Sequence, residues 1–260
     1  MMKCNKRKKI RKRKIASYIL FFLMLTNSLD AENVYAYHIP KTQAEAYPAA
    51  RINELSSFTY IIKEDKLEYK DKNGNVRGIV SFSYPQFTGS SSFLTKLNKQ
   101  LQKKSHKYLN SENAANLKES VKYRIDTNSF YDKSEQYYWT TSCTAAYEKD
   151  GIISFRMTEN WYAGGVHNQS DYGLNYDIKN KKKLTIEDVI AGDSKKAILK
   201  AAKKYCGDDA TAYNIIKRTK KYNFFLQDGD VYICYGSYEL AHGTSIDQFT
   251  VEGCYRQTEK

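Results

Sequence analysis

The chain has little proline, histidine and cysteine, and it lacks the short motifs that mark several common chemistries. Its 260 residues include 3 prolines, 4 histidines and 5 cysteines. No Cys-x-x-Cys pair is present and the histidines stand apart, which excludes the usual zinc-binding spacings. A Gly-x-Ser-x-Gly elbow and a phosphate-binding glycine loop are also absent. The sequence therefore predicts no metal, no cofactor and no catalytic residues, so that the protein is expected not to be an enzyme.

Two weaker catalytic patterns are present, and each has a simpler explanation. Cys143 and His167 would be the members of a Cys/His pair, but no neighbouring residue supports that role. Paired carboxylates occur at 187–188 and at 208–209. Acids in these places are typical of helix starts, where they complement the helix dipole. We therefore interpret both pairs as structural.

The first 36 residues have the pattern of a secretory signal peptide. Nine lysines and arginines lie within residues 3–14, the apolar run Ile15–Leu25 follows, and a small-residue site ends at Ala36. The apolar run is shorter than the ~20 residues of a spanning helix, although residues 15–29 would serve as an uncleaved anchor. We expect an extracellular or cell-surface protein that contacts the membrane only through such an anchor.

The remaining chain is modestly basic. Without residues 1–36, 33 basic and 27 acidic side chains remain, a net charge of +6. This charge suits a protein that works beside an anionic cell wall or membrane, and an ordinary solvated surface explains it equally well. No helix-turn-helix, zinc-finger or RNA-binding signature is present, so nucleic acid is not an expected partner.

Four cysteines follow the leader: Cys143, Cys206, Cys234 and Cys254. In an exported chain they permit two disulfides with three connectivities, which the spacing does not decide. They are equally compatible with small, buried, free side chains.

Hydrophobic patterns and turn residues predict the elements after a flexible lead-in, residues 37–54. Asn73-Gly74, Asp150-Gly151 and Asp228-Gly229 are hairpin turns, and Thr185 is a helix N-cap. Strands are predicted at 58–62, 66–70, 76–84, 137–147, 152–162, 172–178, 224–225, 231–235 and 249–255. Helices are predicted at 93–109, 112–121, 187–190, 195–205 and 210–221.

These elements predict an α+β fold with antiparallel sheets and helices packed on one face. We expect an N-terminal module over residues 55–135 and a C-terminal module over residues 136–260, which together form one compact unit.

Two loops stand out as candidate contact surfaces. In the first, an aromatic strand runs into Gly164 and Gly165, which permit backbone conformations closed to other residues, and then into His167. The second, residues 235–243, carries two tyrosines, an acid and two glycines between the last two strands. Tyrosine suits protein or sugar recognition, although any one of the 23 tyrosines is more often part of a sheet or core.

Five segments in order carry a resemblance to a known family. They are 162–167 (YAGGVH), 175–177 (NYD), 184–188 (LTIED), 225–226 (FL) and 238–243 (YELAHG). The chain resembles the extracellular, lysozyme-sensing domain of the anti-sigma-V factor, which also precedes the catalytic domain of some peptidoglycan deacetylases. Residues 80–101 are similar to the companion module that usually comes before it.

The resemblance implies a non-catalytic binding domain that docks onto lysozyme or another cell-wall-directed protein, with an accessory or enzymatic role on peptidoglycan glycans as the alternative. The residues that it places in contact with the partner are Tyr162, Gly164, Gly165, His167, Tyr235, Tyr238, Glu239 and His242. The family often has proline where this chain has Ser237, which puts the shape of that loop in question. Only 14 residues precede the apolar run, so we expect a stand-alone domain with neither a sigma-binding part before it nor a deacetylase domain after it.

Overall fold

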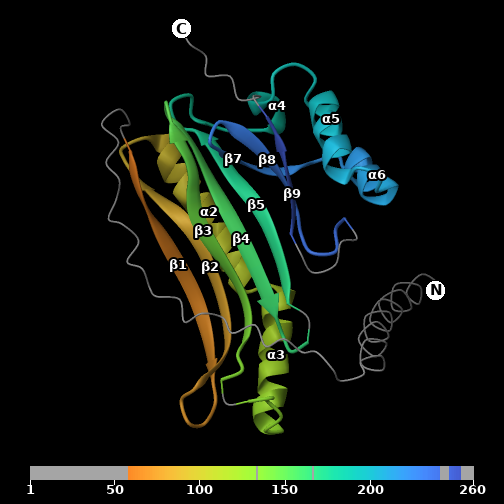
Figure 1. The fold of residues 1–260 in the computed structure, drawn as a ribbon. Helices are drawn as coiled ribbons and strands as arrows, with labels where there is room; N and C mark the ends of the chain where they lie inside the picture. Colours follow the sequence, from red (N-terminus) through yellow and green to blue (C-terminus); the bar gives the residue numbers. More distant parts are fainter. Residues whose placement is uncertain (1–57, 133, 166, 241–245, 253–260) are drawn as a thin grey trace, which may run out of the picture. The chain divides into compact units, whose positions relative to one another are not determined.

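A six-stranded sheet and a three-stranded sheet form the framework of the protein in the computed structural model, which describes residues 58–132, 134–165, 167–240 and 246–252 (Figure 1). The larger sheet contains, in this order, β1 (Thr59–Lys70), β2 (Val76–Thr88), β3 (Tyr137–Lys149), β4 (Ile152–Tyr162), β5 (Asn168–Asp177) and β6 (Lys182–Lys183). The smaller sheet contains β7 (Asn223–Gln227), β8 (Asp230–Tyr235) and β9 (Asp247–Val251). With its helices, this is the predicted α+β class.

The predicted hairpin turns form where the sequence places them. Asp150 and Gly151 both have positive φ, 54° and 83°, and they join β3 to β4. At the first hairpin the Asp71 carboxylate accepts the backbone N–H groups of Asn73 and Asn75 at 2.9 and 3.0 Å. Short polar residues and glycine adopt these conformations at low cost, so the signal is local and easily recognised.

Several strand boundaries differ from the predictions, among them those of β1, β2 and β5. Residues 58–70 were predicted as two strands but form the single strand β1, which lies at the sheet edge and tolerates polar residues in its middle. Strand β2 was predicted to end at Tyr84 and continues to Thr88 through Pro85. β2 pairs with β3 only over residues 78–81, so Pro85 lies where no second neighbour needs its missing N–H. β5 begins at Asn168 instead of Tyr172.

Strands β2 and β3 are parallel, in contrast to the antiparallel pairs around them. The connection between them contains helices α2 (Ser92–Leu109) and α3 (Glu112–Asp126), and a long crossover of this kind returns the chain in the same direction. Ser91 and Ser111 cap the two helices, so α3 is a separate helix. The expected module boundary at residue 135 falls between α3 and β3, and strands from both sides of it share one sheet.

Helices α2 and α3 cover one face of the larger sheet (Figure 1). Leu94, Leu97 and Leu101 on α2 belong to a buried cluster with Phe155 and Met157 on β4. Their spacing of three and four residues makes one apolar stripe on the helix, and burying this stripe against the sheet stabilises both elements.

The smaller sheet packs against the opposite face, at β5. Gly173 allows the contact, because a Cβ atom at this position would lie 1.7 Å from the carbonyl oxygen of Phe224. Beside it the Asn175 amide donates to that same oxygen at 2.8 Å, and the Ser154 hydroxyl donates to Asn175 Oδ1 at 2.6 Å. Ser154 Oγ in turn accepts the N–H of Leu226 at 2.8 Å. Every group of this buried chain is hydrogen-bonded, and two of the bonds cross between the sheets, which fixes their relative position.

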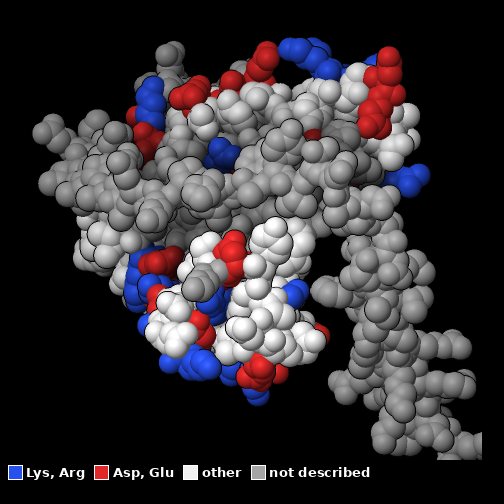
Figure 2. Space-filling view, turned by 60° about the horizontal axis from the view of Figure 1, so that its bottom comes forward, with Lys and Arg blue, Asp and Glu red and all other residues white. Residues whose placement is uncertain are grey.

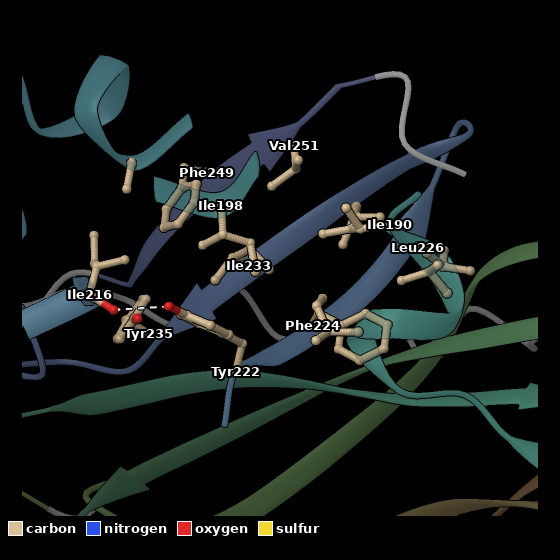
Figure 3. Close-up of a cluster of buried hydrophobic side chains, with 14 of the residues drawn as sticks. Ile190, Ile198, Ile216, Tyr222, Phe224, Leu226, Ile233, Tyr235, Phe249 and Val251 are labelled. Atoms are coloured by element: carbon tan, nitrogen blue, oxygen red, sulfur yellow. Dashed lines mark hydrogen bonds between the residues drawn. The ribbon is translucent and has the colours of Figure 1, made fainter. Parts of the chain in front are cut away.

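A second hydrophobic core lies between the smaller sheet and the helices α4 (Ile186–Val189), α5 (Ser194–Cys206) and α6 (Ala210–Arg218). Figure 3 shows Ile198 of α5 and Ile216 of α6 directed toward Ile233 and Phe249 of the sheet. The Tyr222 hydroxyl donates to the carbonyl oxygen of Ile216 at 3.0 Å. Thr185 and Asp188 form a capping box at the start of α4, which confirms the predicted N-cap.

Cys143, Cys206 and Cys234 are free thiols in the structure, and Cys254 lies outside the described residues. The leader, residues 1–36, and the lead-in, residues 37–54, also lie outside them. Within the described ranges, no helix is long and apolar enough to cross a membrane.

Candidate functional site

A groove of about 260 Å³ lies where the turn after β8 meets the start of β5. This turn is part of the second loop singled out in the sequence. The strand beneath it directly follows the first loop. The lining residues come from three places in the sequence: Glu159 and Trp161 on β4, Asn168, Gln169 and Ser170 on β5, and Gly236, Ser237, Tyr238 and Glu239 in the turn.

Hydrogen bonds to Gln169 hold the turn on β5. The Ser237 N–H donates to the Gln169 carbonyl oxygen at 2.8 Å, and the Gln169 N–H donates to Ser237 Oγ at 2.9 Å. The serine hydroxyl also lies 2.9 Å from the Gln169 carbonyl oxygen, as a donor. A proline at position 237 would have neither the N–H nor the hydroxyl. Ser237 therefore attaches this loop in a way that the proline common in the resembled family does not permit.

The turn is closed internally by its acidic residue. Glu239 Oε2 accepts the Gly236 N–H at 2.7 Å, and the Glu239 N–H donates to the Gly236 carbonyl oxygen at 3.0 Å. Tyr238, between them, has φ 64° and is 52% exposed as a residue. Gly236 fits closely, because a Cβ atom there would lie 2.8 Å from Ser170 Cβ. The turn thus presents a tyrosine ring and a carboxylate beside β5.

Strand alternation sets the opposite wall of the groove. Glu159 and Trp161 lie on the same face of β4 as Met157, which is fully buried under the helices. Burial raises the pKa of Glu159, while hydrogen bonding from Trp139 and the charge of Lys104 oppose the shift. Lys104 on α2 has its Nζ 4.4 Å from the Tyr172 ring centroid, and burial lowers its pKa to about 8.

Asn168 Oδ1, in the groove lining, is buried and has no hydrogen-bond partner among the described residues. The Tyr108 hydroxyl is also buried, and it interacts with the carboxylate of Glu159. The Tyr108 ring stacks on Trp139 at 3.9 Å. Burial raises the pKa of Tyr108, and the charge of Glu159 adds to the effect. A buried polar atom without a partner is uncommon, and Asn168 Oδ1 is therefore available to accept a hydrogen bond from a ligand.

The first predicted loop lies beside the groove without lining it. The Tyr162 ring packs on Tyr137, with centroids 5.8 Å apart, and its hydroxyl donates to Glu135 at 3.3 Å. Gly164 has φ 80°, and a Cβ atom there would meet the Tyr137 hydroxyl oxygen at 2.5 Å, so the glycine is required for packing.

Gly165 and His167 complete this loop. Gly165 is exposed and has φ 106°, with open space where a Cβ would point. His167 is exposed, and its ring centroid lies 6.1 Å from that of Tyr138. Desolvation lowers the pKa of His167. Both residues are accessible to a partner, but they are not groove-lining residues.

The other predicted contact residues divide between core, groove and the undescribed part of the chain. Tyr235 is 6% exposed, and its hydroxyl donates to Thr219 Oγ1 at 3.0 Å, so it belongs to the core of the smaller sheet. Burial raises the pKa of Tyr235 to about 12. Tyr238 and Glu239 line the groove. His242 lies outside the described residues.

Sequence reasoning did not select Glu159, Trp161 or the start of β5. Alternation along β4 was available as a signal, since it places Glu159 and Trp161 on the face of the buried Phe155 and Met157. The join between Gln169 and Ser237, 68 residues apart, had no local signal.

One member of each carboxylate pair caps a helix, and Cys143 and His167 lie in different surroundings. The Cys143 thiol is buried and its pKa is raised by burial, and His167 contacts Tyr138 in the loop after β4. Asp188 belongs to the capping box of α4, and Asp209 accepts the N–H of Ala212 as the N-cap of α6. In the described ranges, no group of three or more His, Cys, Asp and Glu side chains is placed to hold a metal ion.

Charged side chains of both signs lie on the described surface. On the face drawn in Figure 2, basic and acidic side chains lie interspersed on the part that is not grey. The groove differs from this pattern, because its only charged lining residues are Glu159 and Glu239.

Comparison with known proteins gives one family match. The family described as Deacetylase PdaC matches residues 69–170, from the end of β1 to the start of β5. The matched segment contains Glu159, Trp161 and the β5 side of the groove, but not the turn at 236–239. No curated protein shows a significant match.

Two solved structures resemble the chain at low sequence identity. A member of the DUF3298 family from Bacteroides fragilis is 17% identical, with a TM-score of 0.48 over 77% of this chain and 89% of that chain. A DUF3298 family protein from Pseudomonas aeruginosa is 14% identical, with a TM-score of 0.48 over 77% of this chain and 94% of that chain. The deacetylase match agrees with one part of the expected relationship, and the lysozyme-sensing part stays a prediction.

Proposed function

We propose that this chain is an exported, non-catalytic binding domain of the cell envelope, and that the groove between β5 and the turn at 236–239 is part of its contact surface. The observation that carries the proposal is the junction itself. Three hydrogen bonds join Ser237 to Gln169, and they hold an exposed tyrosine and a carboxylate beside an indole. A surface that is fixed before binding loses little conformational entropy when a partner docks.

Lysozyme or another cell-wall-directed protein is the proposed partner. The groove provides Trp161 and Tyr238, residue types that are frequent among energetically dominant contacts. Gly165 and His167 are exposed in the adjoining loop and extend the surface beyond the groove. The basic, apolar leader in the sequence supports a location where such a partner is present.

A titration of the secreted chain with lysozyme tests this function. We expect saturable binding at micromolar concentration or tighter, weakened by Tyr238→Gly, which removes the exposed ring while suiting the positive φ of 64°. Glu187→Gln, on the exposed start of α4, is the matched control and should bind as the parent does. Absence of binding at micromolar concentration would reject lysozyme as the partner.

A peptidoglycan glycan is the second candidate. The combination of an indole ring with Asn168, Gln169 and the two carboxylates is suited to stacking on a sugar and hydrogen-bonding its hydroxyls. Soluble cell-wall fragments should then bind to the chain, and Trp161→Ala should abolish this binding. Turnover of the fragments, abolished by Glu239→Gln, would instead indicate an enzyme.

A further inference from the structure

The lining of the groove combines negative charge with aromatic rings and contains no lysine or arginine. Its two carboxylates are Glu159 and Glu239, and its two rings are Trp161 and Tyr238. This composition is unexpected in a chain whose residues after the leader include 33 basic and 27 acidic side chains. Carboxylates neutralise an ammonium or guanidinium group, and the faces of aromatic rings attract the same groups.

Neither carboxylate is neutralised by an ion pair within the described residues. The nearest cation to influence Glu159 is Lys104, whose ammonium lies over the Tyr172 ring at 4.4 Å and forms no ion pair with Glu159 within 4 Å. Glu239 uses one oxygen to accept the Gly236 N–H, a contact that leaves its charge in place. Glu159 is partly buried and Glu239 is exposed, and neither has an ion-pair partner in the described ranges, so an incoming cation would gain from both charges.

We propose that the groove binds a basic side chain, a lysine or an arginine, of a protein partner. The proposal rests on the proposed function and names the chemical group that the groove recognises. The cation would lie between the two carboxylates, against the indole of Trp161 and the ring of Tyr238. Tyr238 stands at the open side with 52% of its surface exposed, which gives a side chain from another protein direct entry.

An amino sugar presents the same ammonium group and is the competing source. Its ring also carries hydroxyl groups, which need donors as well as acceptors. Asn168 and Gln169 supply neutral donors for them, but the stronger, charged donors of lysine and arginine do not line the groove. A lysine or arginine side chain presents only donors and an apolar stem, which match a lining of carboxylates and rings. The structure therefore favours the protein side chain.

The experiment uses small probes and the whole secreted chain, labelled with nitrogen-15. The chain has two tryptophans, Trp139 and Trp161, so Trp161→Phe assigns the two indole N–H signals. The probes are the Nα-acetyl methylamides of lysine and arginine. The citrulline equivalent is the uncharged match for arginine, and glucosamine with N-acetylglucosamine represents the sugar source.

We expect the lysine and arginine probes to shift the Trp161 indole signal saturably at millimolar concentration, and citrulline to leave it unchanged. Glu159→Gln should weaken binding about tenfold, since a charged pairing is worth more than a neutral one. Glu239→Gln keeps an acceptor for the Gly236 N–H and should also weaken binding, so the test does not depend on one variant. Glu187→Gln is the control, and salt should weaken binding of the parent.

Three results would overturn the inference: equal binding of citrulline, no shift with either cationic probe, or binding of glucosamine alone. The lysozyme titration separates this failure from failure of the proposed function. If lysozyme binds equally well to Glu159→Gln and no probe binds, the proposed function stands and the cation site is rejected. Probe binding without lysozyme binding would keep the cation site and point to another basic protein.

Discussion

Adding one methyl group at Gly173, by the substitution Gly173→Ala, should push the two sheets apart. A Cβ atom there would lie 1.7 Å from the Phe224 carbonyl oxygen, and real Cβ contacts essentially never fall below 3.0 Å. Gly173→Ala therefore requires the strands to move apart by at least 1.3 Å. Two hydrogen bonds of 2.8 Å cross the same interface, from Asn175 to Phe224 and from Leu226 to Ser154. Such a shift takes both beyond the ordinary N–H···O range of about 3.2 Å.

The expected loss follows from these two bonds. Leaving a buried polar group unsatisfied costs about 1–3 kcal/mol, so Gly173→Ala should lower the free energy of unfolding by about 2–6 kcal/mol. This is a large part of the usual total of about 5–15 kcal/mol. Urea unfolding followed by tryptophan fluorescence and far-ultraviolet circular dichroism measures the change.

Gly78→Ala is the matched control. Its Cβ would meet Val121 Cγ2 at 2.6 Å, a side-chain atom rather than backbone, so overpacking of about 1–3 kcal/mol sets its upper range. Both substitutions remove a glycine and so restrict the unfolded chain equally. If Gly173→Ala unfolds within about 1 kcal/mol of the parent, or costs no more than Gly78→Ala, the close contact of the sheets as described is wrong.

Three other predictions concern single contacts. Ser237→Ala removes the hydroxyl that accepts the Gln169 N–H at 2.9 Å and should cost about 0.5–1.5 kcal/mol of stability; amide exchange at residue 169 should accelerate, and unchanged exchange would contradict the proposed attachment. Asparagine and arginine contacts, led by the Asn75 side chain and followed by Arg77, lower the pKa of Asp71 to about 2 from 3.8; the stability it contributes is therefore present above pH 3.8 and lost as pH falls toward 2, and Asp71→Asn should flatten this part of a pH titration of unfolding. Burial raises the pKa of the Cys143 thiol, so a disulfide reagent should modify it only after unfolding, and fast modification in the native protein would refute its burial.

Local chemistry accounts for what the sequence predicts well. The Asp-Gly and Asn-Gly turns, the cap at Thr185 and the stripe on α2 depend on residues within a few positions of each other. The strand ends were predicted less well, because they depend on neighbours. Pro85 lies inside β2 only because β3 pairs with a different part of that strand.

One side of the groove could be predicted from the sequence and the other could not, for the same reason. Tyr238 and Glu239 follow from a tyrosine-rich loop, whereas their neighbours on β5 follow from a contact between Gln169 and Ser237, 68 residues apart. Propensity carries no information about such a pairing, because it depends on how the two sheets pack at Gly173. The role of a serine at position 237 became clear only from the structure, in which its N–H and hydroxyl bind Gln169.

The helix-facing side of β4 gives the strongest reason to regard this groove as functional. Along that side Ile153, Phe155 and Met157 are completely buried, and the next two residues are Glu159 and Trp161. An apolar residue at 159 would extend the core, whereas the carboxylate there is partly buried and burial raises its pKa. The fold therefore places an ionisable group where burial opposes its charge, at the end of the strand where the groove opens. Such conflicts between local stability and residue choice concentrate at binding sites, and a cation arriving from a partner would remove this one.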